Sequence, residues 1–189
     1  NFKFYKIDLL NKNINNFFKN IDTVYHLAAN ADVRFGLKHT KKDINQNIIV
    51  TYKVLEAMKK NNVQNIMFSS TGSIYGETKQ IPTKEFAPLP IQTSLYGASK
   101  ISAEGLICAY SKGFNFKCYI FRFVSILGER YSHGHVFDFV KQLRINKKKL
   151  FVLGDGNQRK SYLNINDCIN AIYISMNFFK EKINIINLG

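Results

Sequence analysis

Apolar and polar stretches alternate along the chain in a way that predicts strands and helices in turn. Short apolar runs, typical of strands in a buried parallel sheet, lie at 4–9, 23–27, 65–70, 119–123, 150–153 and 183–189. Apolar residues at helical spacing lie at 14–18, 42–61, 136–143 and 168–179, the last with Asp167 as its expected cap. An irregular segment before a helix at Tyr96 is marked by Pro82, Pro88 and Pro90. This order predicts an α/β fold with a parallel, doubly wound sheet.

Length and composition fit a globular protein. The chain has 189 residues, 46% apolar and 14% aromatic, which is enough for a sizeable core. It has no run of 18 apolar residues, so we expect no membrane-spanning helix. The first residues lack the pattern of a secretory signal, and Cys108, Cys118 and Cys168 have no metal-ligand spacing. These features favour a cytoplasmic protein.

The formal net charge of +14 raises the possibility of a nucleic-acid partner. The positive residues are mostly lysines that occur throughout the chain with asparagine and isoleucine, and they form no single patch. We therefore expect no nucleic-acid partner, although a basic surface would attract a nucleotide diphosphate. His133 and His135 have no nearby Cys or carboxylate partners, so we expect no metal site.

Tyr96 and Lys100 form the first candidate for chemistry. Residues four apart share a helix face, so the two side chains would project together. A nearby ammonium stabilises a phenolate, which predicts a lowered pKa for Tyr96 and a role as general base toward a hydroxyl group. Thr71 follows the predicted strand 65–70, at the sheet edge where ligands bind in open α/β sheets. The alternative for Tyr96 is an amphipathic residue at a helix start.

Four blocks in this order resemble the extended short-chain dehydrogenase/reductase superfamily. They are His26-Leu27-Ala28-Ala29-Asn30, the Ser69-Ser70-Thr71 tract, Tyr96-x-x-x-Lys100, and Gly154-Asp155-Gly156 through Asp167. Within it, the chain is most similar to the NAD-dependent epimerase/dehydratase family, especially its UDP-glucose 4-epimerase-like members. The resemblance implies a Rossmann-like fold, NAD as cofactor, a nucleotide-sugar substrate and, for the full-length protein, a homodimer formed through helices that include the Tyr96 helix.

The resemblance also implies which residues contact the cofactor. Asp8 and Leu9 would contact the adenine, although Asp8 could equally be a helix cap. The small residues after strand 23–27 would lie beside the diphosphate and ribose, and Asn47 would support the catalytic strand and helix. The full set is Asp8, Leu9, Leu27, Ala28, Ala29, Asn47, Ser69, Tyr96, Lys100 and Val124.

For the substrate, the resemblance implies contacts from Thr71, Gly72, Ser125 and Lys160. Two of these depart from the family pattern. Ser125 stands where the family often has Asn, and its hydroxyl has a shorter reach. Lys160 stands where the family has a diphosphate-binding Arg, and a lysine can hold a phosphate only as a point charge. Arg34 could also reach the substrate, or it could be a solvated surface residue.

The phosphate-binding turn of a dinucleotide-binding unit is absent. None of the eleven glycines forms GxGxxG or the related GxxGxxG. The chain also lacks an initiator Met. We therefore interpret it as an internal fragment, weakly active or inactive alone. Its first β-α-β unit would be missing, with a partial NAD-binding domain at 1–125 and the start of a smaller nucleotide-sugar-binding region at 126–189.

The resemblance implies the chemistry of a 4-epimerase. Tyr96 would remove the proton of the sugar C4 hydroxyl, Lys100 would lower the Tyr96 pKa and bind the nicotinamide ribose, and Thr71 would hydrogen-bond the reacting oxygen. Hydride would pass to NAD and return on the other face of a 4-keto intermediate.

Other activities stay open. Family dehydratases have an Asp-Glu pair after the Thr, where this chain has Gly72 and Ser73, and a Glu of nucleotide-sugar decarboxylases is also missing. Keto-reductase chemistry remains, as does a noncatalytic scaffold, although Thr71, Tyr96 and Lys100 are all present. The sequence does not fix the sugar, the carbon, or the choice between NAD and NADP.

Overall fold

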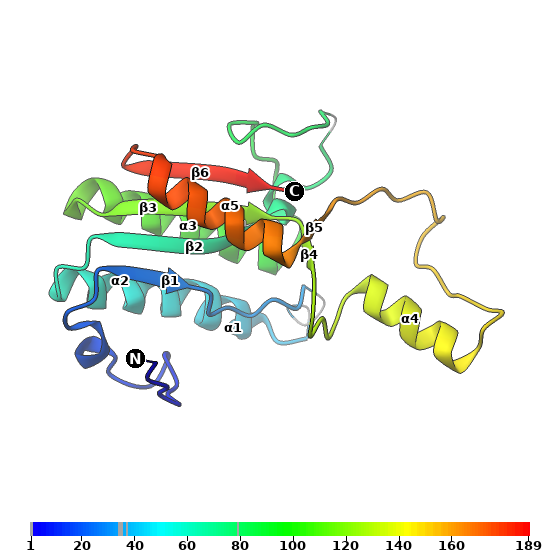
Figure 1. Ribbon diagram of the computed structural model, residues 1–189, viewed down its shortest axis with the longest axis horizontal. Helices are drawn as coiled ribbons and strands as arrows, with labels where there is room; N and C mark the ends of the chain where they lie inside the picture. Colours follow the sequence, from blue (N-terminus) through cyan, green and yellow to red (C-terminus); the bar gives the residue numbers. More distant parts are fainter. Residues whose placement is uncertain (1, 34–35, 37, 79) are drawn as a thin grey trace.

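A parallel sheet of four strands forms the centre of the molecule (Figure 1). The computed structural model describes residues 2–33, 36, 38–78 and 80–189, so Arg34 lies outside the described residues. The strands run in the order β1-β2-β3-β6. Their bounds are β1 Thr23–His26, β2 Asn65–Thr71, β3 Lys117–Phe123 and β6 Ile183–Leu188. Four of the predicted strands are therefore confirmed.

Helices cover both faces of this sheet, which confirms the doubly wound, Rossmann-like prediction (Figure 1). Side chains alternate along a strand, so β2 sends Ile66 and Phe68 to one face and Met67 to the other. On the first face they pack against α2 and α3, and on the second against α5. The three helices are α2 Val50–Lys60, α3 Leu95–Phe114 and α5 Ile165–Phe178.

The helix expected at 42–61 is present, but it is not uniform. It begins as α1 Thr40–Asp43, continues as the π-helical turn η3 Ile44–Ile49, and ends as α2. A π-turn shifts the direction of the side chains relative to a regular α-helix, and such turns often occur at functional sites. Here the turn carries the buried Asn47.

The segment between β3 and α5 extends beyond the carboxyl ends of the strands (Figure 1). β4 Ser125–Leu127 and β5 Tyr162–Asn164 pair in a small parallel sheet. Between them, α4 His135–Ile145 lies apart from the main sheet and buries none of its residues. The helix expected at 136–143 is thus confirmed. Residues 165–189 then return to the main sheet as α5 and β6, in the same layers as the first half of the chain.

Two predicted strands are wrong. Residues 4–9 form no strand, because no described strand lies beside them and an unpaired strand is not stable. Phe4 is accordingly 75% exposed. Residues 150–153 follow α4 in the extended segment, and the N–H of Phe151 donates to the Gln142 side chain at 2.9 Å instead of to a strand.

The predicted cap of the last helix is also wrong. α5 begins three residues before the expected start, and the Asn164 side-chain oxygen accepts from the N–H of Asn166 at 2.8 Å. Asp167 lies inside the first turn, where its negative charge still favours the helix dipole. Two short 3₁₀ turns complete the fold, η1 Asn15–Phe18 and η4 Gly72–Tyr75.

Candidate active site

Thr71 and Tyr96 come from different elements and meet at the carboxyl edge of the sheet. Thr71 ends β2, and its hydroxyl accepts from the N–H of Ser73 at 3.1 Å, which starts η4. Tyr96 lies in the first turn of α3, which begins there because the Ser94 hydroxyl accepts from the N–H of Gly97 at 3.0 Å. The Thr71 side chain interacts with the Tyr96 phenol and favours its ionised form. The structure thus brings together two of the three predicted catalytic residues.

The predicted effect of Lys100 on Tyr96 is wrong. Burial raises the pKa of Tyr96 above its usual value, the Thr71 side chain opposes this rise, and the negative charge of Asp43 adds to it. The Lys100 ammonium lies over the ring of Phe68, with Nζ 4.2 Å from the ring centre. The i,i+4 spacing puts both residues on one helix, but the ammonium is directed to the sheet and does not lower the phenol pKa.

Lys100 itself is strongly buried, with only 2% of its surface exposed. Burial lowers its pKa from 10.5 to about 8, because a charged ammonium loses solvation away from water. The charge of Glu104, one helical turn further along α3, opposes this shift. Lys100 therefore changes its charge near physiological pH.

Asn47 connects the strand β1 to the helix that carries Tyr96. Its side-chain amide donates to the Ser99 hydroxyl at 2.8 Å, and its oxygen accepts from the N–H of Asn30 at 2.7 Å. The Ser99 hydroxyl in turn donates to the backbone oxygen of Tyr96 at 2.8 Å. Asn47 thus fixes the start of α3, which agrees with a supporting role.

Asn30 and Asp43 extend this network, and the sequence analysis missed both as partners. The Asn30 amide donates to Asp43 Oδ1 at 2.7 Å. Asp43 is completely buried, and its Oδ2 has no hydrogen-bond partner among the residues that the structure describes. The only signal for Asn30 was its place after Ala28-Ala29, and nothing in the spacing indicated Asp43.

The residues after β1 fit the approach of a flat cofactor. Leu27, Ala28 and Ala29 are exposed at the carboxyl end of the strand, and two of the three carry only a methyl group. His26 instead points into the protein, where its Nε2 lies 2.8 Å from the Thr51 hydroxyl. Burial, followed by the charge of Lys100, lowers the pKa of His26 to about 4.

The other cofactor candidates have different surroundings. The Asp8 carboxylate accepts from the N–H of Leu10 at 2.9 Å and from the Asn11 side chain at 2.6 Å, which closes a turn. These hydrogen bonds lower the pKa of Asp8. They favour a role for Asp8 in capping a turn, which is close to the helix cap that was the alternative to adenine contact. Leu9 packs against the core, and the Ser69 hydroxyl donates to the His26 backbone oxygen at 3.4 Å.

The substrate candidates fall into two groups. Gly72 directly follows Thr71 and begins η4. The cofactor candidate Val124 lies beside the end of β6, with its N–H donating to the Leu188 oxygen at 3.1 Å. Ser125 begins β4 and pairs with Tyr162 of β5. Lys160 is exposed two residues before Tyr162, so the small sheet brings its backbone toward the Ser125 end of the site.

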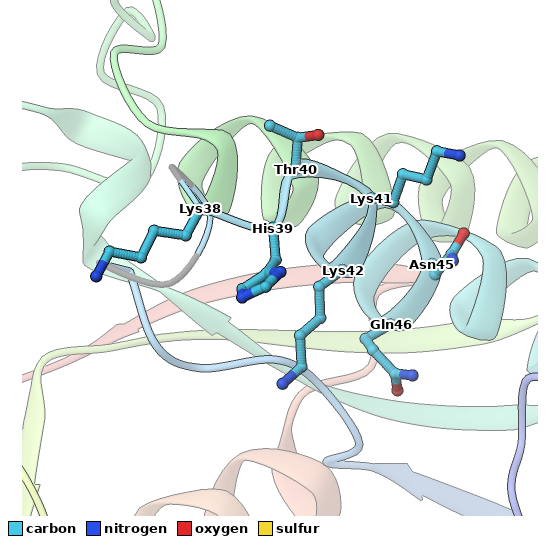
Figure 2. A pocket seen from close by; sticks show the side chains of 7 residues that line it. All are labelled: Lys38, His39, Thr40, Lys41, Lys42, Asn45 and Gln46. Carbon is cyan, nitrogen blue, oxygen red and sulfur yellow. The ribbon is translucent and has the colours of Figure 1, made fainter.

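A separate hollow of about 620 Å³ lies at the start of the α1 helix and not at Tyr96 (Figure 2). Figure 2 shows His39, Lys42 and Gln46 pointing to the same side of this helix. Its lining also includes Lys38, Thr40, Lys41 and Asn45. The hollow is open and rich in lysine, like much of this chain. We place the chemistry at Tyr96, where buried polar groups converge.

Comparison with known proteins agrees with this geometry. Residues 1–189 match the model of the NAD dependent epimerase/dehydratase family. The chain belongs to this family. It is 30% identical over 172 residues to an uncharacterized UDP-glucose epimerase, YtcB, of Bacillus subtilis. The matched region covers 90% of this chain and 54% of the relative. It is 31% identical over 193 residues to a UDP-glucuronate 4-epimerase of Thermodesulfobacterium geofontis, covering 100% and 58%.

The fold of this member of the epimerase/dehydratase family also matches a solved structure. It is a UDP-glucuronic acid 4-epimerase from Bacillus cereus in complex with UDP-glucuronic acid and NAD. The TM-score is 0.87 at 32% identity, over 97% of this chain and 59% of the solved chain. The chain therefore spans about half the length of the relatives it matches. In the part of the chain that the structure describes, no helix is long and apolar enough to cross a membrane.

Proposed function

We propose that this chain carries the catalytic centre of an NAD-dependent nucleotide-sugar epimerase that inverts C4 of a UDP-sugar. The observation that carries the proposal is the placement of Thr71 at the carboxyl end of β2 beside Tyr96 in the first turn of α3, with Lys100 one turn further on α3. The relatives described above are named as UDP-sugar epimerases, which supports this substrate class.

In this proposal, the phenolate form of Tyr96 accepts the proton of the sugar C4 hydroxyl, and Thr71 hydrogen-bonds the same oxygen. NAD⁺, when bound, supplies a hydride acceptor and a positively charged ring, whose charge favours the phenolate that burial alone disfavours. Lys100 would bind the nicotinamide ribose, and the exposed residues Leu27, Ala28 and Ala29 would lie beside the cofactor. Inversion of C4 would then require that the 4-keto sugar turns before hydride is returned to its other face, while Tyr96 gives the proton back to the C4 oxygen.

A 4,6-dehydratase is the second candidate. A dTDP-D-glucose 4,6-dehydratase of Dictyostelium discoideum is 31% identical over 205 residues, covering 100% of this chain and 46% of the relative. Elimination of water requires an added acid and base beside the sugar. Gly72 has no side chain, and Ser73 is exposed and accepts from the Thr71 hydroxyl at 3.1 Å. Neither supplies a carboxyl group, which favours the epimerase.

We further propose that the full-length protein is a homodimer formed through α2 and α3. Ile44 lies in the turn that leads into α2, and Tyr52 lies in α2. They expose 47% and 46% of their surfaces, and a dimer contact along this helix would cover both side chains. Light scattering on the full-length protein would give twice the protomer mass. From the sequence we expect the nucleotide-sugar-binding region at 126–189. Because α5 and β6 return to the main sheet, we now propose 126–164 for this region, with Ser125 and Lys160 at its base.

We also propose a cytoplasmic location without a nucleic-acid partner. Cys108, Cys118 and Cys168 are all free thiols, as is usual in a reducing compartment.

Substitution of Tyr96 tests the proposed function. In the full-length protein, Tyr96→Phe removes the proton acceptor and is expected to reduce turnover of the active UDP-sugar by about 10²–10⁴-fold. Tyr110→Phe is the matched control, because Tyr110 lies on the same helix with its hydroxyl donating to Glu56 at 2.5 Å, away from Thr71. Equal turnover in the two variants would contradict the role of Tyr96.

A further inference from the structure

A buried ion pair lies directly behind the candidate active site. Arg122 Nη2 of β3 lies 2.7 Å from Glu104 Oε2 of α3, and Arg122 Nε lies 3.2 Å from Oε1 and 3.3 Å from Oε2. Both side chains are at most 5% exposed. The Ser70 hydroxyl donates to the same carboxylate, at Oε1. Such a pair is costly to bury, and the cost is offset only when every charge is well hydrogen-bonded, as here.

The positions of these partners relative to the catalytic residues are regular. Glu104 follows Lys100 by four residues and Tyr96 by eight, so the three lie along one face of α3. Ser70 directly precedes Thr71 on β2. The Glu104 carboxylate therefore connects the helix that carries Tyr96 to the strand that carries Thr71.

Arg122 connects the same carboxylate to the segment that leads into α3. Its Nη1 donates to the Tyr75 hydroxyl at 2.5 Å and to the Glu85 backbone oxygen at 2.7 Å. The Tyr75 hydroxyl also donates to the Asn187 side chain at 2.9 Å. The Arg122 guanidinium thus contacts Tyr75 and the segment before Tyr96 directly. It is linked to the end of β2 through Glu104, and to the end of β6 through Tyr75.

We propose that Glu104 is a positioning residue for the reaction, because it holds Tyr96 and Lys100 in place relative to Thr71 through Ser70 and Arg122. This inference rests on the proposed function and adds to it a residue that does not contact the substrate. A carboxylate is needed at this position, because it alone can accept from a serine and a guanidinium while balancing the buried positive charges.

The charge of Glu104 also acts on Lys100. Burial lowers the pKa of Lys100 to about 8, and Glu104 opposes this shift. Other charged or titratable groups also face the Tyr96–Lys100 pair, and they are His26 of β1, Asp43 of α1 and, behind Glu104, Arg122 of β3. Without the negative charge of Glu104, Lys100 would lose its proton at a lower pH.

Glu104→Gln in the full-length protein tests the inference, because the amide keeps the shape but not the charge. We expect kcat to fall on the order of tenfold with little change in KM, and the alkaline limb of kcat/KM to move to lower pH. Ser111→Ala is the matched control, since it removes a buried hydrogen bond to the Phe116 oxygen at 2.7 Å, further along the same helix. The control should leave the alkaline limb unchanged. An unchanged limb and kcat in Glu104→Gln would overturn the inference.

A second variant and a second measurement keep the test decisive. Ser70→Ala keeps the ion pair but frees β2 from Glu104, so kcat should fall several-fold at unchanged KM; an unchanged kcat contradicts the positioning role. The ¹³Cε resonance of Lys100, assigned by its absence in Lys100→Arg, reports its titration without any turnover. If the wild type converts no UDP-sugar, the proposed function fails. A lower titration midpoint in Glu104→Gln would still support the link between Glu104 and Lys100, and an unchanged midpoint would overturn it.

Discussion

Burial sets the behaviour of the individual titratable residues at this site. It raises the pKa of Tyr96 and lowers those of Lys100 and His26, in each case because the charged form loses solvation. The spacing of Tyr96 and Lys100 predicted a cooperating pair, and the structure separates their roles. Sequence spacing gives the helix face but not the solvent exposure of each group, so the sign of the Tyr96 shift could not be predicted from it.

His26 gives a prediction for stability at this scale. Its pKa is about 4 in the folded chain and 6.5 in the unfolded chain, so between these values the unfolded chain binds more protons. Stability is then fully present above pH 6.5 and is lost as pH falls toward 4, by about 3 kcal/mol. Urea unfolding at pH 7 and pH 4.5 should show this loss in the wild type, and less of it in His26→Gln. The same loss in both proteins would contradict the assignment to His26.

Among the elements, the central strands could be predicted from sequence, and the network between them could not. Continuous apolar runs such as Ile66-Met67-Phe68 are buried on both faces of a parallel sheet, so β2 was clear from composition alone. Residues 4–9 have a similar pattern, but a strand also needs a neighbour. The contacts of Glu104 with Ser70 and Arg122 join three elements, and no local pattern encodes such a meeting.

Asn47 gives a prediction for the π-helical turn. Asn47→Ala would leave Asn30 and Ser99 without their buried partner, and we expect the free energy of unfolding to fall by about 1–3 kcal/mol. Asn45→Ala is the control, since Asn45 lies on the same turn but is only half-buried. Denaturant unfolding of the two variants should differ by that amount. Equal stabilities would contradict the role of Asn47 as the connection between β1 and α3.

At the scale of the whole molecule, the Tyr96 edge of the sheet is packed against helices, whereas the extended segment has few packing contacts. The Tyr96 edge is built from α2, α3 and the sheet, whereas α4 buries none of its residues and lies apart (Figure 1). The net charge of +14 comes from lysines that occur in both parts, and it suits attraction of an anionic nucleotide. The chain thus places Thr71 and Tyr96 together at the carboxyl edge of the sheet, and Ser125 and Lys160, proposed for the sugar nucleotide, lie at the base of the extended segment.

The reaction product tests the central proposal most directly. The full-length protein would be incubated separately with UDP-glucose, UDP-glucuronic acid and UDP-N-acetylglucosamine, and the products followed by ¹H NMR. The proposal predicts that one of these sugars reaches equilibrium with its C4 epimer and that denaturation of the enzyme releases NAD. A 4-keto-6-deoxy sugar as product, or no conversion of any UDP-sugar despite bound NAD, would contradict it.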